Sequence, residues 1–234
     1  MANRSSPSNR ILASLPAHEY QRLSRELEPV KLRFGQVLYE PGKPIHHVYF
    51  PLDCLISLLT SVDRQRTLEV GMVGNEGMAG MPFILGVGVS GVRALVQGAG
   101  QALRMASAPF RVEFDRNPAL QQALYRYTYA LMAQISQTAA CNRFHDAGER
   151  LARWLLMTRE RVGADEFSLT QEFLAHMLGL RRVGVTEAAS ELKRRKLITY
   201  TRGRMQILDV AGLKKASCSC YRLVNAVFAR AQRR

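Results

Sequence analysis

Residues 170–208 read TQEFLAHMLGLRRVGVTEAASELKRRKLITYTRGRMQIL, and this stretch decides the fold. Its order of apolar and polar residues predicts a helix, a tight turn, a second helix and a short hairpin. If Gln171 is the first residue of a helix-turn-helix, all seven positions that helix packing constrains carry suitable residues. Five of them are apolar, one is small where the helices cross, and one is a turn glycine that takes a positive φ without strain. These positions are Leu174, Leu178, Leu180, Val185, Ala188, Ala175 and Gly179.

The second helix carries polar residues on its first turn and a half, on the side away from the packing residues. A recognition helix presents this end to base edges in the major groove. Arginine can bridge the acceptors of guanine, glutamate can accept from cytosine, and threonine or valine can touch a thymine methyl. An ordinary helical hairpin with a solvated charged face is the alternative. The predicted DNA-binding residues of this region are Thr170, Gln171, Arg181, Arg182, Val183, Gly184, Thr186 and Glu187.

A β-wing is predicted after the second helix. Leu197–Tyr200 and Met205–Asp209 alternate like short strands on either side of residues 201–204. Arg202 and Arg204 lie near the tip of this hairpin, where they are placed for phosphate contacts. The basic residues at 193–196 are expected to add further phosphate contacts.

The charge of the chain is high and unevenly distributed. The 234 residues carry a net charge of +14, and the pI is about 10.2. Residues 167–234 hold 14 Lys and Arg against 4 Asp and Glu, whereas the rest of the chain is nearly balanced. A basic region of this kind indicates a nucleic-acid binder, although an anionic membrane would also attract it. Because the basic residues lie among helix-turn-helix packing positions, the predicted partner is double-stranded DNA and no membrane.

Several features of the chain bear on its compartment. Met1–Arg10 is polar throughout and is predicted to be a disordered leader, neither a signal peptide nor an anchor. No run approaches the roughly 18–20 apolar residues of a membrane span. Four scattered cysteines, at 54, 141, 218 and 220, give no disulfide framework. A cytoplasmic location is therefore predicted.

The first half of the chain predicts a short helical segment at Ile11–Leu27 and then a small antiparallel β-roll or jelly roll. Short alternating runs, punctuated by glycine and proline, predict its strands. A short helix is expected at Met78–Leu85, inside a glycine-rich apolar segment. The predicted strands are Lys31–Phe34, Val37–Tyr39, Val48–Phe50, Cys54–Leu59, Thr67–Met72, Arg93–Val96 and Ala102–Met105.

A long helix is predicted at Pro118–Arg143, followed by a hinge at 142–145. Its apolar residues step by threes and fours, as a two-helix seam requires. A dimer seam is favoured over packing on the chain's own barrel, and both could hold if two faces of the helix are used. Asp146 and Glu149 form a capping box that starts the next helix. That helix is expected to end near Gly163, and Gly163–Ser168 is expected to link it to the helix-turn-helix. Leu213–Arg230 is expected to be a closing helical segment. The predicted dimer-interface residues are Leu120, Leu124, Tyr127, Leu131 and Ile135.

This order of elements resembles the Crp/Fnr family of bacterial transcription regulators. The resemblance covers nearly the whole chain and is strongest over Leu169–Leu208, with further motifs at Glu40-Pro41-Gly42, Val48-Tyr49-Phe50-Pro51 and Val70-Gly71-Met72-Val73-Gly74. It implies an α+β chain with a cyclic-nucleotide-binding-like roll at 11–116, a dimerisation helix and hinge at 117–145, and a winged helix-turn-helix domain at 146–234. It also implies a homodimer on an inverted repeat, with RNA polymerase as a partner of an activator. Its main base readers would be Arg182, Val183 and Glu187.

The resemblance is weaker at the ligand pocket. The family's pocket for cyclic nucleotides uses a Gly-Glu pair for the ribose and an Arg-Ser or Arg-Thr pair for the phosphate. Here Gly77 is followed by Met78, which cannot replace a carboxylate, and Arg93 is followed by Ala94. Cyclic AMP is therefore not the expected ligand, and no cofactor is predicted. Glu76, Arg93 and Ser136 remain the candidate ligand-binding residues.

Other sensor chemistries find little support. Residues 1–53 hold no cysteine for the iron–sulfur cluster of the oxygen-sensing branch. His46 and His47 are expected to point to opposite faces of a strand, so they cannot bind one metal ion together. The Cys218-Ser219-Cys220 spacing is too short for a pair of zinc ligands. His145 and Glu149 lie one helical turn apart and could bind a metal, but the capping role of Glu149 is sufficient to explain its position. No metal site is predicted.

Two other functions compete with DNA binding. A cupin-like metalloenzyme roll with an accessory basic domain would need several inward-facing histidines and a carboxylate, and the five histidines form no such set. A ligand-binding signalling module with protein partners alone does not explain the basic C-terminal region. The sequence therefore predicts a transcription regulator and not an enzyme.

Overall fold

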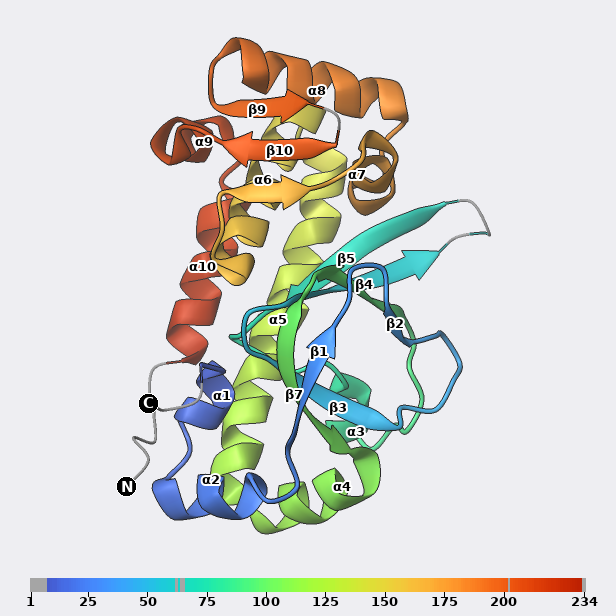
Figure 1. Cartoon of the computed structure of the whole chain (residues 1–234), viewed down its shortest axis with the longest axis vertical. Coiled ribbons are helices and arrows are strands. Elements are labelled where there is room, and N and C mark those ends of the chain that lie inside the picture. The colour runs from blue at the N-terminus through green and yellow to red at the C-terminus, as the bar shows by residue number, and fades with distance from the viewer. Residues whose placement is uncertain (1–7, 62, 64–65, 202, 233–234) are drawn as a thin grey trace. The chain divides into compact units, whose positions relative to one another are not determined.

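The computed structural model (Figure 1) describes residues 8–61, 63, 66–201 and 203–232. The chain divides into two compact units. The first holds residues up to Leu58, Met72–Tyr129 and the chain from Ala231 onward, and the second holds Leu59–Gly71 and Ala130–Arg230. Residues 1–7 of the leader predicted at 1–10 lie outside the described residues. The last residues of that segment are ordered, contrary to the prediction, because Asn9 is fully buried and caps the first helix.

The first unit is built on antiparallel strands, as predicted for a β-roll. Three strands pair in the order β1-β7-β3, and a second sheet has the order β2-β6-β4-β5. The first strand begins three residues earlier than predicted, and the ends of β4 and β5 at residues 59–71 belong to the second unit. The strands are β1 (Glu28–Leu32), β2 (Val37–Tyr39), β3 (His47–Pro51), β4 (Leu55–Ser61), β5 (Thr67–Val73), β6 (Arg93–Gly98) and β7 (Gly100–Ala106).

Short helices complete the first unit. The predicted single segment at 11–27 is instead two helices, because Pro16 cannot continue the first and starts the second. The expected helix at 78–85 is limited to four residues, with Gly80 at its N-cap at φ +113°. The helices are α1 (Arg10–Ala13), α2 (Ala17–Leu23), α3 (Met81–Ile84) and α4 (Ser107–Arg116).

The long helix α5 (Pro118–Phe144) forms as predicted, but the face expected to dimerise is buried within the chain itself. Four of its five predicted interface residues are at most 5% exposed, and Ile135 is half-buried. An apolar stripe on a helix packs equally well against the chain's own core or against a second copy, so periodicity alone cannot separate the two. The four buried residues are Leu120, Leu124, Tyr127 and Leu131.

The predicted capping box starts α6 (Ala147–Val162). The Glu149 amide donates to Asp146 Oδ1 at 2.8 Å, and the Asp146 amide donates to Glu149 Oε2 at 3.2 Å. The helix ends at Gly163, at φ +70°, as expected. Trp154 on α6 is buried in the core of the second unit, and its Nε1–H donates to Glu69 Oε1 at 2.9 Å.

The remaining elements of the second unit form the winged helix-turn-helix. Its three-stranded sheet has the order β8-β10-β9, and the segment at 166–168 is a strand where the sequence predicted only a linker. The closing segment is two helices rather than one. No helix among the described residues is both long and apolar enough to cross a membrane. The elements are β8 (Glu166–Ser168), α7 (Gln171–Leu178), α8 (Arg182–Arg194), β9 (Ile198–Thr201), β10 (Arg204–Ile207), α9 (Val210–Ala216) and α10 (Cys220–Ala231).

Candidate nucleic-acid interface

Helix α7 has well-defined ends that position the turn. The Thr170 hydroxyl accepts from the Phe173 amide at 3.0 Å, which caps the first turn. At the other end Gly179 lies at φ +58°, and the Leu180 amide donates to the Ala175 carbonyl at 3.0 Å. A side chain at Gly179 would strain this left-handed turn, so the glycine predicted for the turn is required there.

Helix α8 has one buried face and one exposed face. Val185, Ala188, Ala189 and Leu192 are at most 6% exposed and pack into the second unit. The residues predicted to read bases lie on the opposite side, around the first turn and a half. Arg181, Arg182, Val183, Thr186 and Glu187 are exposed, Val183 to 60%, and Gly184 is half-buried. The structure therefore brings together the α8 residues that the sequence predicted, on one accessible face.

The exposed face of α8 is joined to the start of α7. The Thr186 hydroxyl lies 3.1 Å from Gln171 Oε1 and 2.9 Å from the Arg182 carbonyl, so it can satisfy one acceptor at a time. Neither Arg181 nor Arg182 has a carboxylate partner among the described residues. Two guanidinium groups on a solvent-facing helix end, without a carboxylate partner in the described part of the chain, are available to an external acceptor such as a base or a phosphate.

The wing packs beside this face. The Tyr200 hydroxyl on β9 donates to the Leu169 carbonyl at 2.9 Å and holds the wing against the strand that leads into α7. Burial raises the pKa of Tyr200, and the positive charge of Arg182 partly offsets this rise. On β10, Arg204 forms an ion pair with Glu166, with Nε 2.8 Å from the carboxylate. Arg202 lies outside the described residues.

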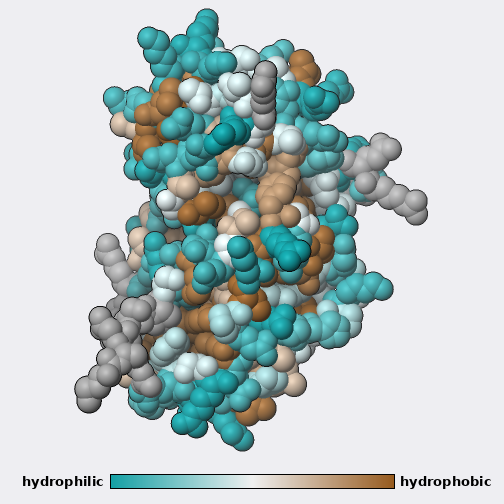
Figure 2. Space-filling view, in the orientation of Figure 1, coloured by the Kyte–Doolittle hydropathy of each residue, from teal (hydrophilic) through white to brown (hydrophobic). Residues whose placement is uncertain are grey.

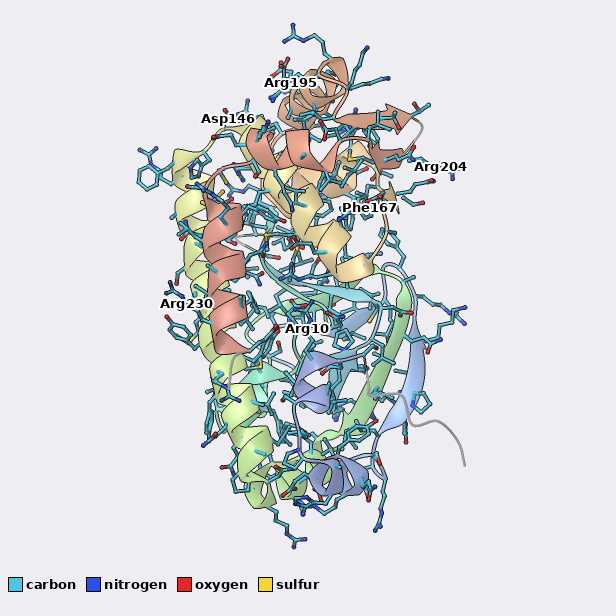
Figure 3. The ribbon with its side chains drawn as sticks, turned by 90° about the vertical axis from the view of Figure 1, so that its left-hand side faces the viewer. Arg10, Asp146, Phe167, Arg195, Arg204 and Arg230 are labelled. Atoms are coloured by element: carbon cyan, nitrogen blue, oxygen red, sulfur yellow. The ribbon has the colours of Figure 1, made fainter. Side chains whose placement is uncertain are left out.

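The basic side chains of this region point outward. Figure 3 shows Arg195 at the C-terminal end of α8 and Arg204 on β10, both projecting away from the ribbon. Arg195 is exposed, as are Lys193, Arg194 and Lys196. In Figure 2 hydrophilic residues cover much of the surface over α8. The exposed residues of this surface thus combine the predicted base-reading residues with flanking positive charge.

The candidate ligand residues differ in their surroundings. Arg93 pairs with Glu40, through Nε and one terminal nitrogen at 2.9 Å each. Glu76 is 7% exposed and accepts from the Gly74 amide at 3.3 Å. Ser136 is exposed on α5. Since Arg93 already has a carboxylate partner, the expectation that it meets an anion is not supported by its surroundings.

A second face of α5 was missed in the sequence. Tyr125, Tyr129 and Met132 are 51%, 66% and 62% exposed. Ser136, Ala139 and Arg143 continue the same line and are also exposed. The spacing alternates four, three, four, three and four residues, which is the heptad pattern of a helix seam. Its signal in the sequence was obscured because the neighbouring core stripe has the same periodicity and stronger apolar residues.

The two helices, the turn, the wing and the basic face define a winged helix-turn-helix DNA-binding protein. Residues 149–216 match the Crp-like helix-turn-helix domain. The chain is 24% identical over 183 residues to the global nitrogen regulator of Nostoc sp., covering 74% of this chain and 82% of that relative. The match assigns residues 149–216 to a Crp-like helix-turn-helix domain, and the chain as a whole is similar to a known transcription regulator.

Solved structures show the same fold. FixK2 from Bradyrhizobium japonicum superposes with a TM-score of 0.65 at 14% identity, over 82% of this chain and 98% of FixK2. A Crp/Fnr-family transcriptional regulator from Thermus thermophilus gives a TM-score of 0.64 at 21% identity, over 81% of this chain and 98% of that one. The α+β architecture inferred from the sequence is confirmed, and the matched helix-turn-helix domain is that of a DNA-binding transcription regulator.

Proposed function

We propose that the chain is a homodimeric, sequence-specific DNA-binding regulator that acts on an inverted repeat. The observation that carries the proposal is the two-faced α8. Its apolar residues are buried, while Arg181, Arg182, Val183, Thr186 and Glu187 stand exposed at its N-terminal end. This is the end that a recognition helix inserts into the major groove. Arg182, Val183 and Glu187 then read bases, and Thr170 and Gln171 at the start of α7 lie close enough to contribute backbone contacts.

The exposed stripe of α5 is the proposed dimer seam. Tyr125, Tyr129 and Met132 supply apolar area, and Ser136 and Ala139 are small enough for a second helix to approach closely. Aromatic residues and methionine are enriched at protein interfaces, and an exposed apolar line of this length needs a partner. A two-fold axis along the seam relates two copies of α8. The two recognition helices then enter successive major grooves about one helical turn, roughly 34–36 Å, apart.

We propose that the roll of this chain needs no cyclic nucleotide. Met78, Ala79, Met81 and Ile84 are at most 7% exposed, so the segment where the family places its ribose-binding carboxylate is packed with apolar residues. Arg93 is paired with Glu40. A regulator with this roll binds its DNA site without cyclic AMP. RNA polymerase is the expected partner if the chain is an activator, and the cytoplasm is the expected location.

Substitution of Arg182 tests the recognition role. On a site enriched from random duplexes, Arg182→Ala should weaken specific binding by about 1–3 kcal/mol and relax the choice of base at one position of each half-site. Fluorescence anisotropy titrations at constant salt, on the enriched site and on a scrambled one, measure both effects.

Arg25→Ala is the matched control, since Arg25 is exposed in the first unit and its removal changes the net charge by the same amount. The control should leave the ratio of specific to non-specific affinity unchanged. If Arg182→Ala also leaves this ratio unchanged, Arg182 does not read bases and the assignment of α8 as the recognition helix is wrong.

A further inference from the structure

Four residues with metal-binding side chains converge in the second unit. Cys141 lies in the last turn of α5, and His145 follows four residues later, one helical turn along. The His145 amide donates to the Cys141 carbonyl at 3.1 Å, which keeps this turn intact beyond the end of α5. Cys218 and Cys220 lie between α9 and the first residue of α10. We refer to these four residues as the Cys3His cluster.

The donor atoms of the Cys3His cluster are close to tetrahedral spacing. Sγ of Cys141 lies 3.5 Å from Sγ of Cys218, and Sγ of Cys220 lies 3.5 Å from Nδ1 of His145. All four donor atoms lie within 4.8 Å of one another. A tetrahedral zinc ion, with bonds of about 2.3 Å to sulfur and 2.0–2.1 Å to nitrogen, separates its ligand atoms by about 3.5–3.8 Å. The thiols are free, at a distance well beyond the ~2.05 Å of a disulfide bond.

The surroundings of the cluster are also those of a metal site. All three cysteines are buried, at most 4% exposed, while His145 is half-buried and closes the side nearest to solvent. The Gln137 side-chain amide donates to Sγ of Cys220 at 3.0 Å. A donor directed at sulfur from outside the ligand set is the kind of contact that orients and stabilises a metal-bound thiolate.

Two buried arginines beside the cluster lack anionic partners. Arg150 and Arg153 on α6 are 7% and 5% exposed, and neither has a carboxylate partner among the described residues. The Nε of each also has no hydrogen-bond partner there. Both lie close enough to Cys141 and Cys218 to interact with them electrostatically. Buried charges need compensation, and a zinc ion with three thiolates and a neutral imidazole carries a net charge of −1.

We propose that Cys141, His145, Cys218 and Cys220 bind one Zn²⁺ ion. Three soft thiolates and an imidazole select zinc over the oxygen-preferring Mg²⁺ and Ca²⁺. An iron–sulfur cluster distributes its thiolates over several iron atoms, and donors this close together favour a single ion. Four protein ligands leave no open position, so the ion is structural. The ion connects the start of α10 to the junction between α5 and α6. Helices α10 and α5 run side by side there (Figure 3).

In the sequence, Cys218 and Cys220 form an isolated pair whose spacing is predicted to be too short for two zinc ligands. Cys218 lies before α10 and Cys220 begins it, so the change of backbone direction between them lets both sulfurs face one point. The other two ligands come from residues more than seventy positions earlier in the chain. Only the packing of α10 beside α5 reveals the set.

Metal content of the purified full-length chain tests the proposal. Protein prepared under reducing, anaerobic conditions with zinc in the medium should contain one Zn²⁺ per chain by inductively coupled plasma mass spectrometry. The double variant Cys218→Ala/Cys220→Ala should lose the metal. Cys54→Ala should retain it, because Cys54 is a buried cysteine of the first unit and serves as the matched control.

A second variant and a spectroscopic measurement keep the result independent of folding. His145→Ala removes a half-buried ligand and should lower zinc affinity at least about tenfold in competition with a chromophoric chelator, since even outer-shell partners contribute that much. Exchange with Co²⁺ should give the thiolate charge-transfer and tetrahedral ligand-field absorption bands. Wild-type protein with native circular dichroism that holds no zinc after reconstitution would overturn the proposal. So would zinc retained by the double variant, or a Cys141–Cys218 disulfide in the reduced preparation.

Discussion

Helices α5 and α8 both have two distinct faces, but they differ in what those faces carry. In α8 the apolar residues are buried and the exposed face is polar and basic. In α5 both faces are apolar. Leu120, Leu124, Tyr127 and Leu131 are buried, while Tyr125, Tyr129 and Met132 are more than half exposed.

The side-chain composition of each exposed face determines what it is suited to bind. Exposed guanidinium and carboxylate groups lose little by remaining in water, and they form directional bonds with base edges and phosphates when DNA is present. Exposed tyrosine and methionine side chains are stabilised when another apolar surface removes them from water. The face of α8 therefore fits a nucleic acid, and the outer face of α5 fits a second copy of the same helix.

The buried face of α5 gives the largest predicted effect. Leu124→Ala should lower the free energy of unfolding by about 2–5 kcal/mol, because it removes a fully buried side chain and leaves a cavity. Urea denaturation followed by circular dichroism measures the change. If Leu124→Ala instead leaves stability intact and dissociates a dimer, the buried and exposed faces have been assigned the wrong way round.

The exposed face should respond in the opposite manner. Tyr129→Glu places like charges on both sides of the proposed seam and should weaken dimerisation by about 2 kcal/mol or more, the range of an interface hot spot. Sedimentation equilibrium over a range of protein concentrations gives the dimer dissociation constant. Tyr20→Glu serves as a control for the change of residue type, because Tyr20 is a half-buried tyrosine of α2 and not part of the proposed seam. An unchanged dissociation constant for Tyr129→Glu would exclude this face from the dimer.

The junction that separates α5 from α6 depends on its cap. Asp146→Ala removes the acceptor of the Glu149 amide and should lower the free energy of unfolding by about 1 kcal/mol. Thermal unfolding of this variant is best compared with that of Asp115→Ala, in which an exposed aspartate on α4 is removed. Equal stabilities of the two variants would mean that the capping box contributes nothing.

The wing gives the smallest predicted effect and separates phosphate contacts from base contacts. Arg204→Ala should weaken binding to specific and scrambled DNA alike and reduce the slope of log K against log salt by about 1. The ion pair with Glu166 limits the loss, since Arg204 must share its guanidinium with that carboxylate. Anisotropy titrations from low to moderate salt provide the slope. A loss confined to the specific site would show that Arg204 reads sequence.

The sequence predicted the helix-turn-helix well because local chemistry decides it. Gly179 must adopt a positive φ, Thr170 caps α7, and Val185 and Ala188 must pack, so each residue constrains its own position. The capping box at Asp146 and most strand positions of the roll follow from equally local signals. The break at Pro16 is also local, and it was missed because the apolar spacing continued across it.

Features that depend on distant parts of the chain were not predictable in this way. The face of α5 that is buried is decided by the roll packed against it, and periodicity does not encode that choice. The pairing of Arg93 with Glu40 joins β6 to the end of β2, 53 residues apart. Strand β8 was read as a linker because its three residues form a strand only by pairing with β10.

Selection from random-sequence duplex DNA with the purified protein is the decisive test of a dimeric regulator that binds an inverted repeat without an added ligand. We expect enrichment of an inverted repeat whose half-site centres lie about 10–10.5 base pairs apart, or a multiple of this spacing. Enrichment of a single unrepeated half-site, or of no sequence at all, would rule out a ligand-independent dimer of this kind.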